Sequence, residues 1–418
     1  MRILIICTLA YIALVSSKKS YNGYELLNIE LNNYQRILLI ENLISINKVQ
    51  PASVVILKIQ PFVLLVHGEV AELIYELLTN LGTKYSIEEN IDNLLKIHEN
   101  YNSMAPLQSN GTLNLNRYHT YDNIVQWMFQ MKRDHSNDVK IIKIGKSWQK
   151  RSIFTIKINK GGKIGRKAIW LDAGIHANEW IGPAVMLYFI KDLLTGNSQM
   201  INFMTDNFDW YITPVINPDG YNFAWKHDRL WRKTRSSHPN NKCVGVDANR
   251  NWNIFFGEKL DTKDECSNTY EGPFAFSEPE VKAVASFLKS KHDIIAYLAF
   301  HSYSQAWMIP FANSKSDKPR DYDRLINMAK DISAAVTSKN GEKYTFGRIS
   351  EFAGEATGSS ADYTYLKLNI TYSFGVELRD RGFYGFLLPP DQIFPTAQEN
   401  LVGLYTLSQR LASLRNTF

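Results

Sequence analysis

Two patterns of hydrophobic and polar positions alternate along most of the chain. Four segments carry near-continuous apolar runs, which is the pattern of strands buried on both faces of a sheet. They are residues 167–173, 208–216, 294–300 and 370–378. Four segments with apolar residues every three to four positions predict amphipathic helices. They are residues 182–196, 278–291, 322–336 and 396–414. We therefore expect an α/β fold, with a mixed, largely parallel sheet and helices on both faces.

A separate unit is predicted nearer the N-terminus, over residues 20–100. Its strand patterns are 24–31, 54–59 and 62–68, and its helical patterns are 34–45, 69–82 and 91–100. Strands and helices mixed in this way predict a small α+β domain of the ferredoxin-like type. Residues 101–116 are polar and contain Pro106 and Gly111, so they are expected to form a linker to a second domain at 117–418.

The first residues resemble a signal peptide. Arg2 is followed by an apolar run from Ile3 to Val15 and by the small residues Ser16 and Ser17. This run is shorter than the roughly 18–20 residues that a membrane span needs. We therefore expect residues 1–17 to be removed, the protein to be secreted to the extracellular space, and no part of it to be anchored in a membrane.

Bulk composition narrows the function classes. The chain has 418 residues, enough for two domains with large cores. Its formal net charge of +6 is spread along the sequence without a block of five basic residues. Such a distribution gives no sign of nucleic-acid binding.

Three cysteines are present, and Cys7 lies in the predicted signal peptide. Cys243 and Cys266 then remain as an even pair in an oxidising compartment, which favours a disulfide. Two free buried thiols are the alternative.

Acidic and imidazole side chains follow three of the predicted strands. His176 and Glu179 come after 167–173, His301 follows 294–300, and Glu377 lies near the end of 370–378. Taken singly, each has an ordinary interpretation: a hydrogen-bonded histidine, a surface glutamate, or a partner for a nearby arginine. Ligands of α/β proteins bind beyond the carboxyl ends of the strands. Two imidazoles and a carboxylate there would form an open zinc site, with a further carboxylate left to transfer protons.

Five motifs in order give the chain a specific resemblance. GIHANEW (174–180) is followed by WRKTR (231–235), CVGVDANRNW (243–252), HSYSQ (301–305) and VELRDRGFYGFLLP (376–389). In these motifs the chain resembles the zinc metallocarboxypeptidases of the pancreatic A/B type, which are secreted as proenzymes. The resemblance implies that residues 20–100 are an activation prodomain that inhibits the enzyme, and that residues 117–418 are the catalytic domain.

The resemblance also implies a metal centre and a reaction. One Zn²⁺ per chain would be held by His176, Glu179 and His301. Zinc-bound water would attack the C-terminal peptide bond with Glu377 as general base, and Arg232 would stabilise the oxyanion.

Substrate contacts follow from the same motifs. Asn249 and Arg250 would hold the terminal carboxylate of a peptide or protein substrate. Asp247 would orient the first histidine ligand, and Tyr303 and Phe386 would form aromatic walls of the outer subsites. The resemblance pairs Cys243 with Cys266 in a disulfide, in agreement with their number.

Two positions depart from the family pattern. Asn178 stands where the family usually has an arginine that guides the peptide. Gly354 stands where the family has a mobile tyrosine that caps the bound substrate. We expect weaker or altered peptide binding from these changes, and a catalytically impaired protein that only binds peptides or partners is the alternative to an active enzyme.

The pocket for the terminal side chain is expected to be neutral and wide. Ala361 occupies the specificity position, and Ala312, Ala353, Ala356 and Gly375 match other wall positions. We therefore favour bulky apolar or aromatic C-terminal residues. The neighbouring acids Glu355 and Asp362 keep a basic, B-type preference open as an alternative.

Activation of the proenzyme poses a separate question. Family members are usually cleaved after a basic residue in the linker, and no Lys or Arg lies between Lys96 and Arg117. Another protease would have to act, or the protein would work with its prodomain attached. We expect a monomer.

Overall fold

The computed structural model of this protein describes most of the chain. The described residues are 18–30, 35, 39, 43, 54–59, 62–88, 95–96, 98–100, 112–239, 241–258 and 262–415. The predicted signal peptide (1–17), most of the predicted linker and most of the predicted helix 34–45 lie outside them. No helix within the described ranges is long and apolar enough to span a bilayer.

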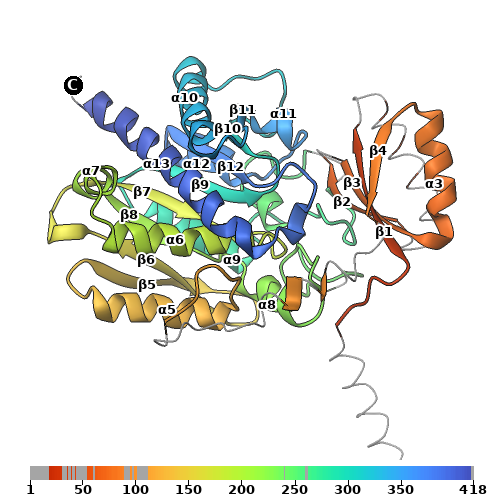
Figure 1. Ribbon diagram of the computed structural model, residues 1–418, viewed down its shortest axis with the longest axis horizontal. Helices are drawn as coiled ribbons and strands as arrows, with labels where there is room; N and C mark the ends of the chain where they lie inside the picture. The colour runs from red at the N-terminus through yellow and green to blue at the C-terminus, as the bar shows by residue number, and fades with distance from the viewer. Residues whose placement is uncertain are drawn as a thin grey trace, which may run out of the picture.

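An eight-stranded mixed sheet forms the centre of the larger domain (Figure 1). Its strands are β5 (Val139–Lys146), β6 (Ser152–Ile158), β7 (Lys167–Asp172), β8 (Phe208–Thr213), β9 (Ile294–Ser302), β10 (Ala306–Ile309), β11 (Thr345–Arg348) and β12 (Tyr372–Leu378). Their order is β11-β10-β12-β9-β7-β8-β6-β5. The neighbours β12, β9, β7 and β8 are parallel, which confirms the predicted mixed, largely parallel sheet.

Helices cover both faces of this sheet. They are α5 (Tyr121–Asp134), α6 (Ile181–Thr195), α7 (Gln199–Asn207), α8 (Pro218–Lys226), α9 (Pro279–Lys289), α10 (Tyr322–Asn340), α11 (Ile349–Phe352), α12 (Ser360–Leu368) and α13 (Ile393–Arg415). One hydrophobic core joins the sheet to α5, α6, α7, α10 and α13. A second core lies on the other face, beneath α9. Burial on both faces explains the continuous apolar runs of the central strands.

Close packing of α9 against the edge strand β5 depends on Gly145. A Cβ at this glycine would lie 2.4 Å from the Cβ of Ala283, nearer than real carbon atoms approach. The register of β5 with β6 also shifts between Lys143 and Gly145, a bulge of the kind common at sheet edges. The same edge exposes Lys140, Lys143 and Lys146, and charged side chains on an edge strand oppose pairing with another chain.

The N-terminal unit is a four-stranded antiparallel sheet with a helix packed on it. Its elements are β1 (Tyr24–Glu30), β2 (Val54–Ile59), β3 (Phe62–His67), α3 (Gly68–Asn80) and β4 (Lys84–Glu88), with strand order β2-β3-β1-β4. Side chains alternate along β3: Leu64 and Val66 pack toward α3, whereas Leu65 packs against the larger domain. In Figure 1, α3 lies on the side of the sheet away from that domain.

Several short elements were not anticipated from the sequence. They are β4, β10, β11, α7, α8, α11 and α12. All have nine residues or fewer, so each contains too few repeats of a strand or helix period to be recognised. α8 also begins at the turn-like sequence Asn217-Pro218-Asp219-Gly220, in which Asn217 caps the helix through Gly220 N.

Glu280 in the first turn of α9 is a buried carboxyl that favours its protonated form. Its Oε1 accepts a hydrogen bond from Trp148 N (2.9 Å), while Oε2 has no partner among the described residues. Burial and then the charge of Glu278 raise the pKa of Glu280 from 4.5 to about 8. Because the folded-state pKa is raised, the carboxyl costs stability increasingly as the pH rises from 4.5 toward 8.

We therefore expect Glu280→Gln to stabilise the protein at pH 7.5 and to change little at pH 4.5. The gain should reach a few kcal/mol, at about 1.4 kcal/mol per unit of pKa difference. Calorimetric melting temperatures at the two pH values would measure it. Glu258→Gln, at an exposed position, serves as the control. An equal effect of Glu280→Gln at both pH values would contradict the assignment.

Candidate metal centre and substrate pocket

Strand ends bring the predicted metal ligands together. His176 and Glu179 lie in the turn that joins β7 to α6, and His301 is the second-last residue of β9, which is parallel to β7. In the parallel pairing of β12 with β9, Glu377 stands directly beside His301. The parallel strands thus bring all four side chains to the end of the sheet where the carboxyl ends of the strands lie.

The three candidate ligands form a compact, buried cluster. Nδ1 of His176 lies 2.8 Å from Glu179 Oε1, and Nδ1 of His301 lies 3.1 Å from Glu179 Oε2. One donor atom from each residue falls within 4.8 Å of the others. Two imidazole nitrogens and one carboxylate fit a four-coordinate zinc ion with its last position open, so the residues present match the predicted zinc site.

Asp247 fixes the orientation of His176. Nε2 of His176 lies 3.0 Å from Asp247 Oδ1, so an N–H at Nε2 donates to the carboxylate and leaves Nδ1 free to bind metal. The second oxygen of Asp247 accepts from Arg232 Nη2 at 2.9 Å. One carboxylate therefore positions both the first ligand and the arginine assigned to the oxyanion.

The electrostatic field of this cluster keeps its acids ionised. Burial alone would raise the pKa of Glu179, but His176 and His301 outweigh it and hold that pKa well below its usual range. Burial of Asp247 is outweighed in the same way, chiefly by Arg232 and His176, and its pKa is also strongly lowered. Both carboxylates are therefore charged at neutral pH, as a cation site requires.

Asn249 and Arg250 stand beside the metal cluster, in the short helical turn Ala248–Arg250. Asp247 caps this turn by accepting from Asn249 N (2.9 Å), and Asn249 Oδ1 accepts from Ser360 N (2.9 Å). Gly358 makes this approach possible: its φ is +64°, and a Cβ there would lie 1.9 Å from Arg250 O. Both Asn249 and Arg250 line the cavity that contains the metal cluster.

Beyond the cluster, the cavity has a mostly apolar wall. Ala312, Ala353, Ala356, Ala361 and Gly375 all line it, as the sequence predicts, together with Met308 and Ile349. The neighbouring acids do not. Asp362 turns its carboxylate to the backbone N–H groups of Ala312 and Asn313, and Glu355 Oε1 accepts from Lys315 N. Neither acid is among the described residues that line the cavity.

The two departures from the family pattern have structural counterparts. The side chain of Asn178 is buried, and its Nδ2 donates to Leu230 O (3.3 Å). It is absent from the described lining of the cavity. Gly354 has φ +73°, a conformation that a tyrosine would adopt only with strain. The backbone at this point is therefore shaped around a glycine.

Tyr303 and Phe386 lie beneath the N-terminal unit. Their rings meet edge to face with centroids 5.1 Å apart, and Leu65 and Leu95 of the N-terminal unit pack with them in one hydrophobic cluster. Phe386 lines the cavity, whereas Tyr303, at 1% exposure, lies outside its described lining. The predicted outer subsites are thus covered in this structure.

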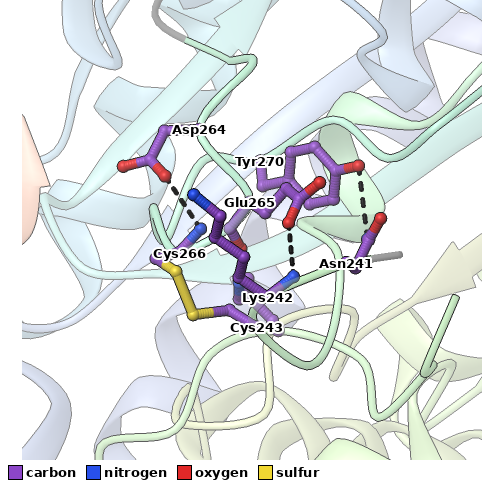
Figure 2. Close-up of a disulfide and its surroundings, with 8 residues drawn as sticks. Asn241, Lys242, Cys243, Asp264, Glu265, Cys266 and Tyr270 are labelled. Atoms are coloured by element: carbon purple, nitrogen blue, oxygen red, sulfur yellow. Dashed lines mark hydrogen bonds between the residues drawn. A yellow bond between two sulfur atoms is a disulfide. The ribbon is translucent and has the colours of Figure 1, made fainter. Parts of the chain in front are cut away.

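Cys243 and Cys266 form a disulfide, which confirms the predicted pair (Figure 2). Figure 2 shows the bond bracketed by local hydrogen bonds, from Cys266 N to Asp264 Oδ1 and from Asn241 Nδ2 to the Tyr270 hydroxyl. The three residues that follow Cys266, namely Ser267, Asn268 and Thr269, line the cavity. Nothing in the sequence marks these three residues as part of the cavity wall except their position directly after a cysteine.

Arg229 is a second functional neighbour that the sequence did not single out. Its Nη1 donates to Asn178 O (2.8 Å) and its Nη2 to Phe386 O (2.6 Å). The guanidinium also stacks on Trp180, 3.7 Å from the ring centroid. It therefore joins the ligand loop to the loop that carries Phe386. In the sequence, Arg229 is one of four basic residues between positions 229 and 235, and nothing distinguishes it from the others as a link between two loops.

Comparison with known proteins agrees with this geometry. Residues 124–403 match the family model for zinc carboxypeptidase. The chain is 39% identical to human carboxypeptidase A6 over 327 residues, which cover 77% of this chain and 74% of that protein. It is 38% identical to pig carboxypeptidase A1 over 333 residues, covering 78% of this chain and 79% of the relative.

Solved structures resemble nearly the whole chain. The crystal structure of thrombin activatable fibrinolysis inhibitor superposes with a TM-score of 0.83 at 32% identity, over 93% of this chain and 98% of that one. Coverage of this extent includes most of the N-terminal unit as well as the larger domain.

Substitution of the candidate ligand residues should show which side chains hold the metal. We expect the wild-type protein to bind one zinc ion per chain and His301→Ala to lose affinity by more than about 100-fold. Asp247→Asn should lose about 10–100-fold, because among the three metal ligands Asp247 contacts only His176 and acts on the metal through its orientation. Competition with a chromophoric chelator would measure both. His292→Ala, an exposed histidine outside the cluster, is the control, and equal affinities in all three variants would contradict the assignment.

Proposed function

Because this chain belongs to the zinc carboxypeptidase family, we propose that it is a secreted exopeptidase that removes single C-terminal residues from peptides and proteins. One observation carries the proposal. The metal cluster, Glu377, Arg232 and the Asn249–Arg250 pair all line one cavity. Arg250 adds a second guanidinium besides Arg232, and it is suited to bind the terminal carboxylate of a substrate, an anion that an internal peptide bond does not offer.

Each residue of the cavity has a defined task in this proposal. Zinc, when bound, supplies a Lewis acid that polarises the scissile carbonyl and lowers the pKa of water. Glu377, partly exposed at the end of β12, accepts the proton of the attacking water and returns it to the leaving amine. Arg232, fixed by Asp247, stabilises the negative charge that develops on the carbonyl oxygen.

Substrate selection depends on the wall of small residues. We propose that bulky apolar or aromatic C-terminal residues are preferred, because alanines and Gly375 leave the pocket wide and uncharged. The orientation of Asp362 supports this: its carboxylate is fully buried, and burial raises its pKa to about 7 despite hydrogen bonds from Ala312 and Asn313. A carboxyl so held is a poor partner for a substrate lysine.

A second candidate function rests on the altered substrate contacts. The burial of Asn178 and the left-handed backbone at Gly354 leave two family contacts unmade. They favour a protein that binds zinc and peptides without efficient turnover. We propose the active enzyme in preference, because the residues assigned to the chemistry share one intact cavity.

The N-terminal unit is proposed to act as the inhibitor of this enzyme. Leu65 and Leu95 occupy the aromatic surface of Tyr303 and Phe386, where the residues of a long substrate would lie. The hydroxyl of Tyr21 donates to Asp228, which brings the segment after the predicted signal peptide onto the larger domain. The disulfide agrees with secretion, since such bonds persist in oxidising compartments.

Hydrolysis of short peptides tests the proposed reaction. After processing by several proteases, the protein should release one residue from peptides with a free C-terminal carboxylate. Amidated peptides should be resistant, and a chelator should abolish release. No turnover by any processed, zinc-loaded form would instead support the binding function.

The role of Glu377 has a separate signature. We expect Glu377→Gln to lower kcat by about 10²–10⁴-fold, with zinc content unchanged, because the side chain moves protons and does not bind metal. Arg250→Ala should mainly raise KM, since it binds the substrate carboxylate before and during reaction. Steady-state kinetics on one peptide would separate the two effects. A Glu377→Gln protein with wild-type kcat would exclude the assignment.

Charge in the pocket should set specificity. We expect Ala361→Asp to shift preference from peptides ending in Phe or Trp toward those ending in Lys or Arg, by at least about tenfold in the ratio of kcat/KM. Ala361→Asn, similar in size but neutral, is the matched control and should not favour basic residues. A wild-type protein that already prefers Lys termini would overturn the proposed specificity.

A further inference from the structure

His98 joins the N-terminal unit to the catalytic domain. It lies in the last described helical segment before the linker and is 3% exposed. Its ring stacks on Tyr118, with centroids 5.0 Å apart and planes at 23°, and packs against Trp180 at 5.3 Å. Trp180 directly follows the ligand Glu179. The imidazole is therefore inserted into the catalytic domain, one residue from the metal cluster along the chain.

The surroundings of His98 disfavour a positive charge. The charged or polar groups that face it from packed elements are the Arg229 guanidinium, the Tyr118 hydroxyl and the backbone of Leu388. Asp380 and Asp391 act electrostatically on Tyr118, and the neighbours of His98 on its own segment, Lys96 and Glu99, are exposed. Arg229 is itself buried at 7% exposure. Burial and this cation both lower the pKa of His98, against a hydrogen bond with the Leu388 backbone.

We propose that His98 is a pH-sensitive latch, so that its protonation in mildly acidic solution weakens the docking of the N-terminal unit and favours exposure of the Tyr303–Phe386 surface. The docked state requires a neutral ring, because a second buried cation would stand beside Arg229. In the undocked state the ring is solvated and takes up a proton freely. Acid would then favour the open state of this surface without a cut in the linker, which has no basic residue between Lys96 and Arg117.

The sign and size of the effect follow from linkage. The pKa of His98 is lowered in the docked state and is ordinary, 6.5, when the ring is solvated. Docking is therefore unaffected well above pH 6.5 and weakens as pH falls below it. From pH 7.5 to pH 5.5 the docking equilibrium constant should fall about tenfold, since at pH 5.5 about ten of every eleven undocked molecules are protonated.

Thiol labelling of the full chain measures docking without catalysis. Leu65 is 2% exposed in the interface, so in a Leu65→Cys background the labelling rate by an alkylating reagent reports opening. The rate is compared at each pH with that of the same background carrying His98→Gln, which cancels the pH dependence of the thiol. We expect the ratio of the two rates to rise about tenfold between pH 7.5 and pH 5.5.

Two further variants keep the test decisive. His98→Phe retains an aromatic ring and replaces His98→Gln if the amide destabilises the fold. His67→Gln changes a histidine of the same unit that packs on Tyr24, and it should leave the pH response intact. A rate ratio that is constant with pH would overturn the latch. The inference rests on the proposed inhibitory role of the N-terminal unit, but labelling needs no hydrolysis, so failure of the enzyme assay would count against the proposed function alone.

Discussion

The Asp247 carboxylate is the interaction on which the rest of the site depends. Its two oxygens contact His176 and Arg232, and it caps the turn that carries Asn249 and Arg250. A fully buried acid of this kind is costly unless it is paired. Here each partner that neutralises it has a place in the proposed chemistry. The residues proposed for metal binding, oxyanion stabilisation and carboxylate recognition are therefore held in fixed relative positions by one side chain.

A second constraint is the shared surface between the two domains. The aromatic pair Tyr303–Phe386 is apolar, and in this structure it is covered by Leu65 and Leu95. Arg229 lies at the same place, joining the ligand loop to the Phe386 loop while its charge opposes protonation of His98. In the proposed function, a long substrate and the N-terminal unit would use this same surface. Inhibition and substrate affinity are therefore expected to change together.

The altered substrate contacts fit this picture. Asn178 is bonded to Leu230 O and the backbone at Gly354 is left-handed, so neither position supplies the substrate contact that the resemblance to the family implies there. The remaining polar contacts of the cavity lie close to the metal cluster, and its wall is alanine-rich. Recognition should consequently rest on the terminal carboxylate and on apolar burial of the terminal side chain.

Long elements and residue identities could be predicted because their signals are local. The predicted strands and helices are found as β7, β8, β9 and β12 and as α6, α10 and α13. A strand buried on both faces has an unbroken apolar run, and a helix of several turns repeats its apolar positions often enough to be recognised. β10, β11 and α12 were missed because four to nine residues hold too little of any period. The ligand set was recognised because its motifs contain the chemical groups themselves.

The sequence by itself determined which side chains are available to the site. They are the two imidazoles, the carboxylates of Glu179, Asp247 and Glu377, the arginines and the alanines of the pocket wall. Only the tertiary structure decided how they are used. The register that sets Glu377 beside His301, the turn of Asp362 away from the cavity and the insertion of His98 beside Arg229 all join residues distant in the chain. Their physical reason is packing between elements, which fixes distances and burial that no local pattern encodes.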